Sequence, residues 1–136
     1  MKVFLDNNII IDLLHENRNG HKLATRVLDT LLKKQCLFIV TPLTIANAHY
    51  ILKAHYKVLK PVKRIEALTN LGSISIMDES QVKRSYKDNW KDFEDSLQYQ
   101  SALEAKCDCI ITNDKKGFKQ STIDVYSPIK FLEEYK

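Results

Sequence analysis

The feature that most constrains the fold is a short apolar segment at the start of the chain that ends in a polar cluster. Residues 2–5 are predicted to form a buried strand, and Asp6, Asn7 and Asn8 follow it directly. Carboxylates and amides in this position fit a crevice, because open α/β sheets bind ligands outside the carboxyl ends of their strands. We therefore expect Asp6 at the mouth of a site. Asn8 would cap the next helix or reach into the site, and Asp12 would lie one helical turn further on the same face.

More carboxylates stand at element boundaries in the second half of the chain. Asp92, Glu94 and Asp95 lie at the start of a predicted helix, and Asp114 follows a predicted strand. Any one of them is explained equally well as a helix cap or a turn residue. Together with Asp6 they are harder to explain in that way, because ligand sites of parallel sheets gather residues from several strand ends. We expect Asp6, Asp95 and Asp114 to converge on one point.

Strand and helix patterns alternate along the sequence. Strands are predicted over 2–5, 37–41, 74–77, 108–112 and 123–126; helices over 8–16, 21–34, 42–57, 61–70, 79–89, 95–106 and 128–135; and a turn or short 3₁₀ segment over 113–118. No hairpin signal joins two strands, so the pattern predicts an α/β fold with a parallel sheet flanked by helices. The length suits one hydrophobic core, and we expect a single domain over residues 1–136.

The charged residues indicate two chemically different segments. The chain has 21 Lys and Arg against 17 Asp and Glu, a net charge of +4, which permits an anionic partner without identifying one. Residues 53–64 are rich in Lys and Arg, and residues 88–95 are rich in Asp and Glu. A basic run is more often a solvated face. Beside an acidic cluster it also fits a polyanion bound by the first segment and metal ions bound by the second.

The cysteines and the hydropathy pattern bear on the compartment. Cys36, Cys107 and Cys109 are odd in number, which argues against a disulfide framework and for reduced thiols. The last two are expected on one face of a predicted strand, as buried apolar groups. No segment approaches the roughly 20 apolar residues that span a bilayer, and the start has no apolar core of a signal peptide. We expect a cytoplasmic protein without a membrane segment.

Three longer segments occur in a characteristic order: FLDNNIIIDLL at the start, TPLTIANAHYIL in the middle and DFEDSLQYQSALEAKCDCIITNDKKGF near the end. With the total length, they resemble the PIN-domain family, and most of all its small VapC-like toxin ribonucleases. The resemblance covers essentially the whole chain. It implies a PIN-like three-layer fold with a central parallel sheet flanked by helices. It also implies a nuclease site in which three or four acids bind Mg²⁺ or Mn²⁺.

The resemblance assigns candidate residues within that site. Asp6 matches the first acid of the family, Asp95 the acid that opens the helix leading into SALEA, and Asp114 the position two residues after the Thr that ends the fourth strand. These three are the expected catalytic and metal-binding residues. Accessory candidates are Asn8, Asp12, Asn47, Asp92, Glu94 and Thr112, and candidates for binding the RNA backbone are Lys115, Lys116 and Lys119. Thr112, or its neighbour Asn113, is expected to orient the attacking water.

The chain departs from the family at two positions. The family has a Glu in the third helix, and the corresponding residue is Asn47; Gly117 stands where relatives often have Asp. An amide oxygen coordinates Mg²⁺ but brings no negative charge. Asp92 and Glu94 lie close enough to Asp95 in sequence to supply a replacement carboxylate.

Two functional hypotheses follow. The first is a Mg²⁺- or Mn²⁺-dependent endoribonuclease that cleaves single-stranded RNA, forms a homodimer and is the toxin of a toxin–antitoxin pair, with an antitoxin protein as partner. The second is a catalytically weakened PIN-fold module that binds RNA or a protein. A flavodoxin-like receiver or a nucleotide-binding module is disfavoured, because the sequence offers no clear Asp–Lys receiver pair and no Gly-rich phosphate loop.

Overall fold

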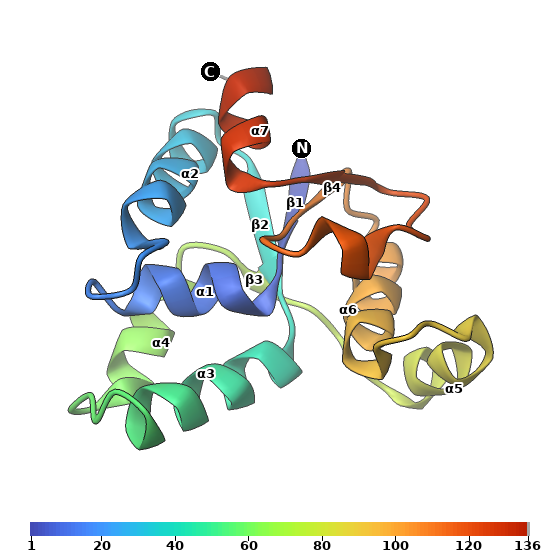
Figure 1. Ribbon diagram of the computed structural model, residues 1–136, viewed down its shortest axis with the longest axis horizontal. Helices are drawn as coiled ribbons and strands as arrows, with labels where there is room; N and C mark the ends of the chain where they lie inside the picture. Colours follow the sequence, from blue (N-terminus) through green and yellow to red (C-terminus); the bar gives the residue numbers. More distant parts are fainter. Residues whose placement is uncertain (136) are drawn as a thin grey trace.

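The predicted strands form one parallel sheet in the computed structural model, which describes residues 1–135. The strands are β1 (Lys2–Leu5), β2 (Leu37–Val40), β3 (Ser73–Ile74), β4 (Cys109–Ile111) and β5 (Asp124–Tyr126), in the spatial order β3-β2-β1-β4-β5. The helices are α1 (Asn7–Leu14), α2 (His21–Lys33), α3 (Pro42–Ala54), α4 (Pro61–Thr69), α5 (Glu79–Asp88), α6 (Phe93–Glu104) and α7 (Pro128–Glu134), with a 3₁₀ turn η1 (Lys115–Phe118). The predicted α/β class and three-layer arrangement are confirmed (Figure 1).

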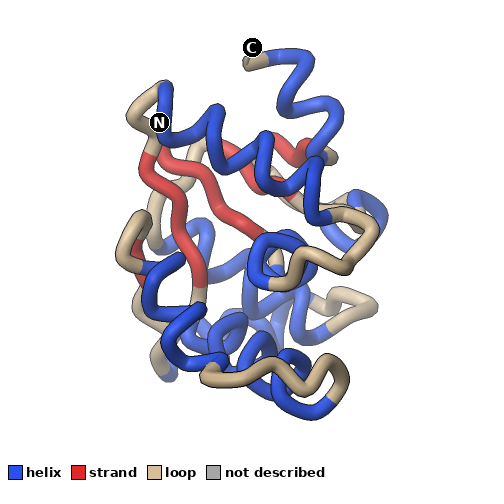
Figure 2. Tube along the Cα trace, turned by 90° about the vertical axis from the view of Figure 1, so that its left-hand side faces the viewer, coloured by secondary structure: helices blue, strands red, loops and turns tan. Residues whose placement is uncertain are grey.

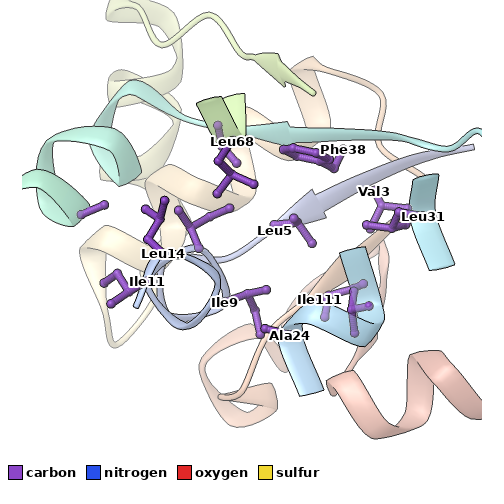
Figure 3. Packing of buried hydrophobic residues seen from close by; sticks show 14 of the residues in the cluster. Val3, Leu5, Ile9, Ile11, Leu14, Ala24, Leu31, Phe38, Leu68 and Ile111 are labelled. Atoms are coloured by element: carbon purple, nitrogen blue, oxygen red, sulfur yellow. The ribbon is translucent and has the colours of Figure 1, made fainter. Parts of the chain in front are cut away.

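Alternate side chains of the central strand enter two separate cores, as the pleat of a buried strand requires. Val3 and Leu5 pack with residues from α1, α2, α3, α4 and α7 on one face (Figure 3). Phe4 packs on the other face with residues from α6 and η1. The strands lie beside one another with helices packed around them in the turned view (Figure 2). Burial on both faces explains why residues 3–5 of β1 are all apolar instead of alternating between apolar and polar.

The register brings the ends of two neighbouring strands together at one edge of the sheet. Leu5 of β1 lies opposite Ile111 of β4, so the residues that follow each strand emerge side by side. The backbone N–H of Asp6 continues the ladder by donating to the carbonyl of Ile111 at 3.0 Å. The convergence of sequence segments 106 residues apart follows from this parallel pairing.

Several predicted boundaries are wrong for identifiable reasons. The third strand is Ser73–Ile74 rather than 74–77, because it lies at the sheet edge and Ile76, 71% exposed, has left the sheet. Helix α6 begins at Phe93 rather than Asp95, because Asp92 accepts a hydrogen bond from the backbone N–H of Asp95 at 3.1 Å and caps the helix. Such a cap contributes about 1 kcal/mol.

The two later cysteines do not share a face. Cys107 lies in the turn before β4 and packs with the α6 side of the sheet, whereas Cys109 lies in the strand and packs with the α1 side. The period-2 argument failed because Cys107 precedes the strand, which begins only at Cys109. Both thiols are free and buried, as expected. Within residues 1–135, no helix combines the length and the apolar character that crossing a membrane demands.

Candidate active site

Asp6 and Asp114 are held in place by one buried hydroxyl. Thr112 Oγ1 donates to Asp6 Oδ2 at 2.7 Å and accepts from the backbone N–H of Asp114 at 3.0 Å. Thr112 is fully buried and Asp6 is 5% exposed. The hydroxyl thus has both its partners and no access to solvent. Thr112 therefore holds these two acids in place, and its role toward an attacking water stays a prediction.

Asp95 enters the same region from the first turn of α6. A Cβ added at Gly117 would overlap Asp95 Oδ2 and lie 2.9 Å from Asp114 Oδ2, so both carboxylates lie against this glycine. The backbone N–H of Gly117 donates to Asp114 Oδ1 at 3.2 Å. A side chain at position 117 would therefore have to push these two carboxylates aside. The departure from the family at this position lets both carboxylates lie against the backbone here.

The acids influence one another electrostatically. Burial raises the pKa of Asp95 to about 7, helped by the nearby charges of Asp6, Asp92, Asp114 and Glu94. Burial likewise raises the pKa of Asp6, opposed by the hydrogen bond from Thr112 and reinforced by Asp114 and Asp92. The carboxylates that were predicted to converge therefore share one local field, together with Asp92 and Glu94. Perturbed carboxyl pKa values of this kind are typical of functional sites.

Asn47 contacts one of these carboxylates. Its Nδ2 donates to Glu94 Oε1 at 3.1 Å, joining α3 to the start of α6. Burial raises the pKa of Glu94, and the charges of Asp92 and Asp6 raise it further. A carboxylate thus lies beside the residue that stands where the family has its second acid.

The accessory candidate Asp12 makes its contacts outside this cluster. Asp12 is 5% exposed and pairs with Arg18, whose Nε donates to Oδ1 at 2.6 Å. Asn113 donates to the other oxygen of Asp12 at 3.2 Å. Within residues 1–135, no hydrogen bond links Asp12 to Asp6 or Asp95. In this structure Asp12 fastens the loop after α1 through Arg18 and is also contacted by Asn113.

Asn8 does not cap helix α1. Asp6 occupies the N-cap position and the helix begins at Asn7, so Asn8 is an exposed residue of the first turn. Because helix α1 begins one residue earlier than predicted, Asn8 lies inside its first turn and not at the N-cap. We find no interaction of its side chain with the acids among the described residues.

A cavity of about 710 Å³ opens beside the cluster. Its lining residues are Trp90, Lys91, Asp92, Asp95, Asp114, Lys116, Gly117, Lys119 and Gln120. Two of the predicted RNA-binding lysines thus face the acids, whereas Lys115 is exposed but does not line the cavity. Trp90, Lys91 and Gln120 were not among the predicted site residues. No pattern in the sequence indicated that these three residues line the site.

The donor set suits a divalent cation, because carboxylate and amide oxygens are the ligands that Mg²⁺ prefers. However, no group of three or more His, Cys, Asp or Glu side chains in residues 1–135 is already arranged to hold a metal ion. An unassembled site is expected for carboxylates without a cation, because their like charges repel one another. Each carboxylate then accepts hydrogen bonds from backbone N–H groups and hydroxyls instead. The chemistry of the gathered carboxylates around Asp95 is what fits a cation here. Rotation of these side chains is what ligation would require.

Comparison with known proteins gives consistent matches. A family model described as PIN domain matches residues 2–116. The chain is 30% identical over 139 residues to Ribonuclease VapC1 of Aquifex aeolicus (strain VF5), an alignment covering 98% of this chain and 95% of that protein.

Solved structures share the fold at lower identity. A chain in the crystal structure of VapBC2 from Rickettsia felis bound to a promoter DNA fragment superposes with a TM-score of 0.70 at 15% identity, covering 93% of this chain and 98% of that chain. A chain of VapBC-1 from nontypeable Haemophilus influenzae gives a TM-score of 0.66 at 23% identity, covering 96% and 100%.

Proposed function

The chain belongs to the PIN-domain family, and on that basis we propose that it is a metal-dependent endoribonuclease that cleaves single-stranded RNA. The observation that carries the proposal is the group of mutually coupled carboxylates at the ends of β1 and β4 and the start of α6. The cavity beside them has lysines within it, as a site for a phosphodiester backbone requires.

Each residue has a role that follows from its surroundings. Asp6, Asp95 and Asp114 are the proposed ligands of Mg²⁺ or Mn²⁺, and Thr112 orients two of them. When bound, such an ion supplies Lewis-acid stabilisation of phosphoryl charge and lowers the pKa of a bound water. Lys116 and Lys119 attract the phosphates of the substrate toward the acids.

The partners are proposed from the relatives. Among the solved structures that share the fold are VapBC and FitAB assemblies, which supports an antitoxin protein as a partner of this chain. We propose a single domain over residues 1–136 that forms a homodimer. The free, buried thiols of Cys107 and Cys109 support action in a reducing compartment such as the cytoplasm.

RNA cleavage by the protein purified away from any antitoxin tests this function directly. We expect single-stranded RNA to be cleaved with Mg²⁺ or Mn²⁺ and to stay intact with EDTA, because the acids need a counterion to act on an anionic substrate. Restoring the metal after EDTA should restore cleavage. Absence of cleavage with every divalent ion tried, or cleavage that EDTA leaves untouched, would contradict the proposal.

The salt dependence of RNA binding should show whether Lys116 and Lys119 in the cavity contact phosphates. Each phosphate contact on a single strand contributes about 0.7 to the slope of log affinity against log salt. Replacing both Lys116 and Lys119 by Gln should therefore lower that slope by about 1.4. Measurements of RNA binding in EDTA across a salt series give the slope. Lys22→Gln on the exposed side of α2 is the matched control, and Lys115→Gln should have the smaller effect of a residue outside the cavity.

An unchanged slope in the double variant would mean that these lysines do not contact phosphates. Equal losses in all three variants would indicate only a general effect of net charge.

A further inference from the structure

Trp90 is a fixed aromatic surface in the segment between α5 and α6. Its ring stacks on Tyr99 at 4.7 Å between centroids and 25° between planes, and it meets the ring of Phe118 edge-on at 5.8 Å and 86°. Both supporting rings are buried, and the hydroxyl of Tyr99 is hydrogen-bonded to Thr122 at 2.9 Å. The indole is therefore held from one side by the core.

The same indole remains partly exposed and lines the cavity that holds the acids. Besides the acids, its cavity neighbours are Lys91, Lys116 and Lys119, together with the amide of Gln120. A flat apolar surface, several cations and an amide in one cavity match a base and its phosphates.

From this geometry we infer a nucleobase subsite in the cavity, in which a base of the RNA strand stacks on Trp90 while the lysines hold the adjoining phosphates. The inference rests on the proposed function, because it names how the substrate of that site is held. Stacking on an aromatic side chain is tolerant of base identity. The subsite thus adds affinity for RNA next to the acids, and it does not select a particular base sequence.

Trp90 is the only tryptophan in the chain, so its fluorescence reports on the subsite without any label. In EDTA, which prevents metal-dependent cleavage, a single-stranded RNA oligonucleotide should quench or shift the emission. An oligomer of the same length without bases should bind through its phosphates, seen by anisotropy of a labelled end, and leave the emission unchanged. A mononucleotide should act only at much higher concentration, because it lacks the neighbouring phosphates.

Substitutions test the energetic contribution. Trp90→Ala should weaken RNA binding by about 5- to 150-fold, the usual range for removing one stacking partner. Trp90→Phe should retain most of the affinity, since phenylalanine also stacks. Phe93→Ala is the matched control, because Phe93 is 46% exposed and stacks on Tyr86 but does not line the cavity. Trp90→Phe and the wild-type fluorescence keep the test valid if the alanine variant fails to fold.

RNA that binds by anisotropy without changing the tryptophan emission would overturn the subsite. So would equal emission changes with the base-free oligomer, or a mononucleotide that binds as tightly as the oligomer. Cleavage with Mn²⁺ by the wild type separates the two proposals. A protein that cleaves RNA but shows no fluorescence response refutes the subsite alone. One that responds but never cleaves refutes the nuclease and leaves the base-binding site.

Discussion

Replacing Asp95 by Asn should abolish RNA cleavage and at the same time stabilise the metal-free protein. Burial raises the pKa of Asp95 to about 7, and the charges of Asp6, Asp92, Asp114 and Glu94 raise it further. The amide keeps the shape and removes the charge. In the metal-free protein, the variant is stabilised because one negative charge no longer repels the other acids. In the metal-bound protein, the variant loses activity because one charged ligand is missing.

The loss of activity should exceed about 100-fold, the upper figure for losing only an outer partner of a metal ligand. Millimolar Mg²⁺ or Mn²⁺ should raise the melting temperature of the wild type, because an ion that binds the folded state stabilises it. The double variant Asp6→Asn and Asp95→Asn should fold and lose this shift. Asp29→Asn, an exposed acid on α2, is the control that should leave both quantities unchanged.

The pH dependence of stability follows from the same carboxyl. Because its pKa in the folded protein, about 7, lies above the ordinary value of 3.8, the folded state binds more protons than the unfolded state between these values. The stability of the metal-free wild type should therefore fall as pH rises from about 4 to about 7. Asp95→Asn should flatten this dependence. A melting temperature that rises over that range in EDTA, with the same profile in the variant, would place Asp95 outside a repulsive cluster.

The convergence of the acids was predictable because it depends on topology alone. Parallel strands share one carboxyl edge, so an acid after β1 and another after β4 meet once the strands are neighbours. The exposed end of the third predicted strand was not predictable, because Ile76 is apolar in sequence and only its edge position frees it. The capping role of Asp92 was equally hidden, since Asp is favourable both at an N-cap and in the first turn.

Other features depend on contacts between distant segments. Asp12 falls on the helical face of a site residue, yet Arg18 from the following loop neutralises it. No periodicity encodes that loop path. The stacking of Trp90 on Tyr99 likewise arises where the segment before α6, α6 itself and η1 meet, so no sequence pattern placed Trp90 in the site.

The last prediction concerns how the chain functions with Asn47 where the family has a Glu. Asn47 donates to Glu94 Oε1 at 3.1 Å, so the two positions are in direct contact. The helices that carry them are fixed by a buried network: Gln98 Nε2 donates to Thr44 Oγ1 and Thr41 Oγ1 donates to Gln98 Oε1, both at 2.8 Å. A charge moved from position 94 to position 47 therefore stays in nearly the same place.

We propose that Glu94 supplies the carboxylate that Asn47 lacks. Glu94→Gln should weaken Mn²⁺ binding and RNA cleavage by about 10- to 100-fold, the range for losing a supporting group of a metal site. Asn47→Glu alone sets two carboxylates against each other and should give no gain. The double variant Asn47→Glu with Glu94→Gln restores one carboxylate and one amide, and it should recover most of the lost activity.

Metal titration by calorimetry, alongside the cleavage assay, separates ligation from folding. Glu104→Gln, at the far end of α6, is the control for losing an acid on this helix. If Glu94→Gln cleaves like the wild type and Asn47→Glu alone raises both metal affinity and cleavage, the second acid is missing and uncompensated. If the wild type is inactive with every divalent ion and Asn47→Glu restores cleavage, the natural protein is a weakened module. If Glu94→Gln loses activity and only the double variant regains it, a carboxylate at position 47 of α3 can replace one at position 94 of α6. That result would support the proposed role of Glu94.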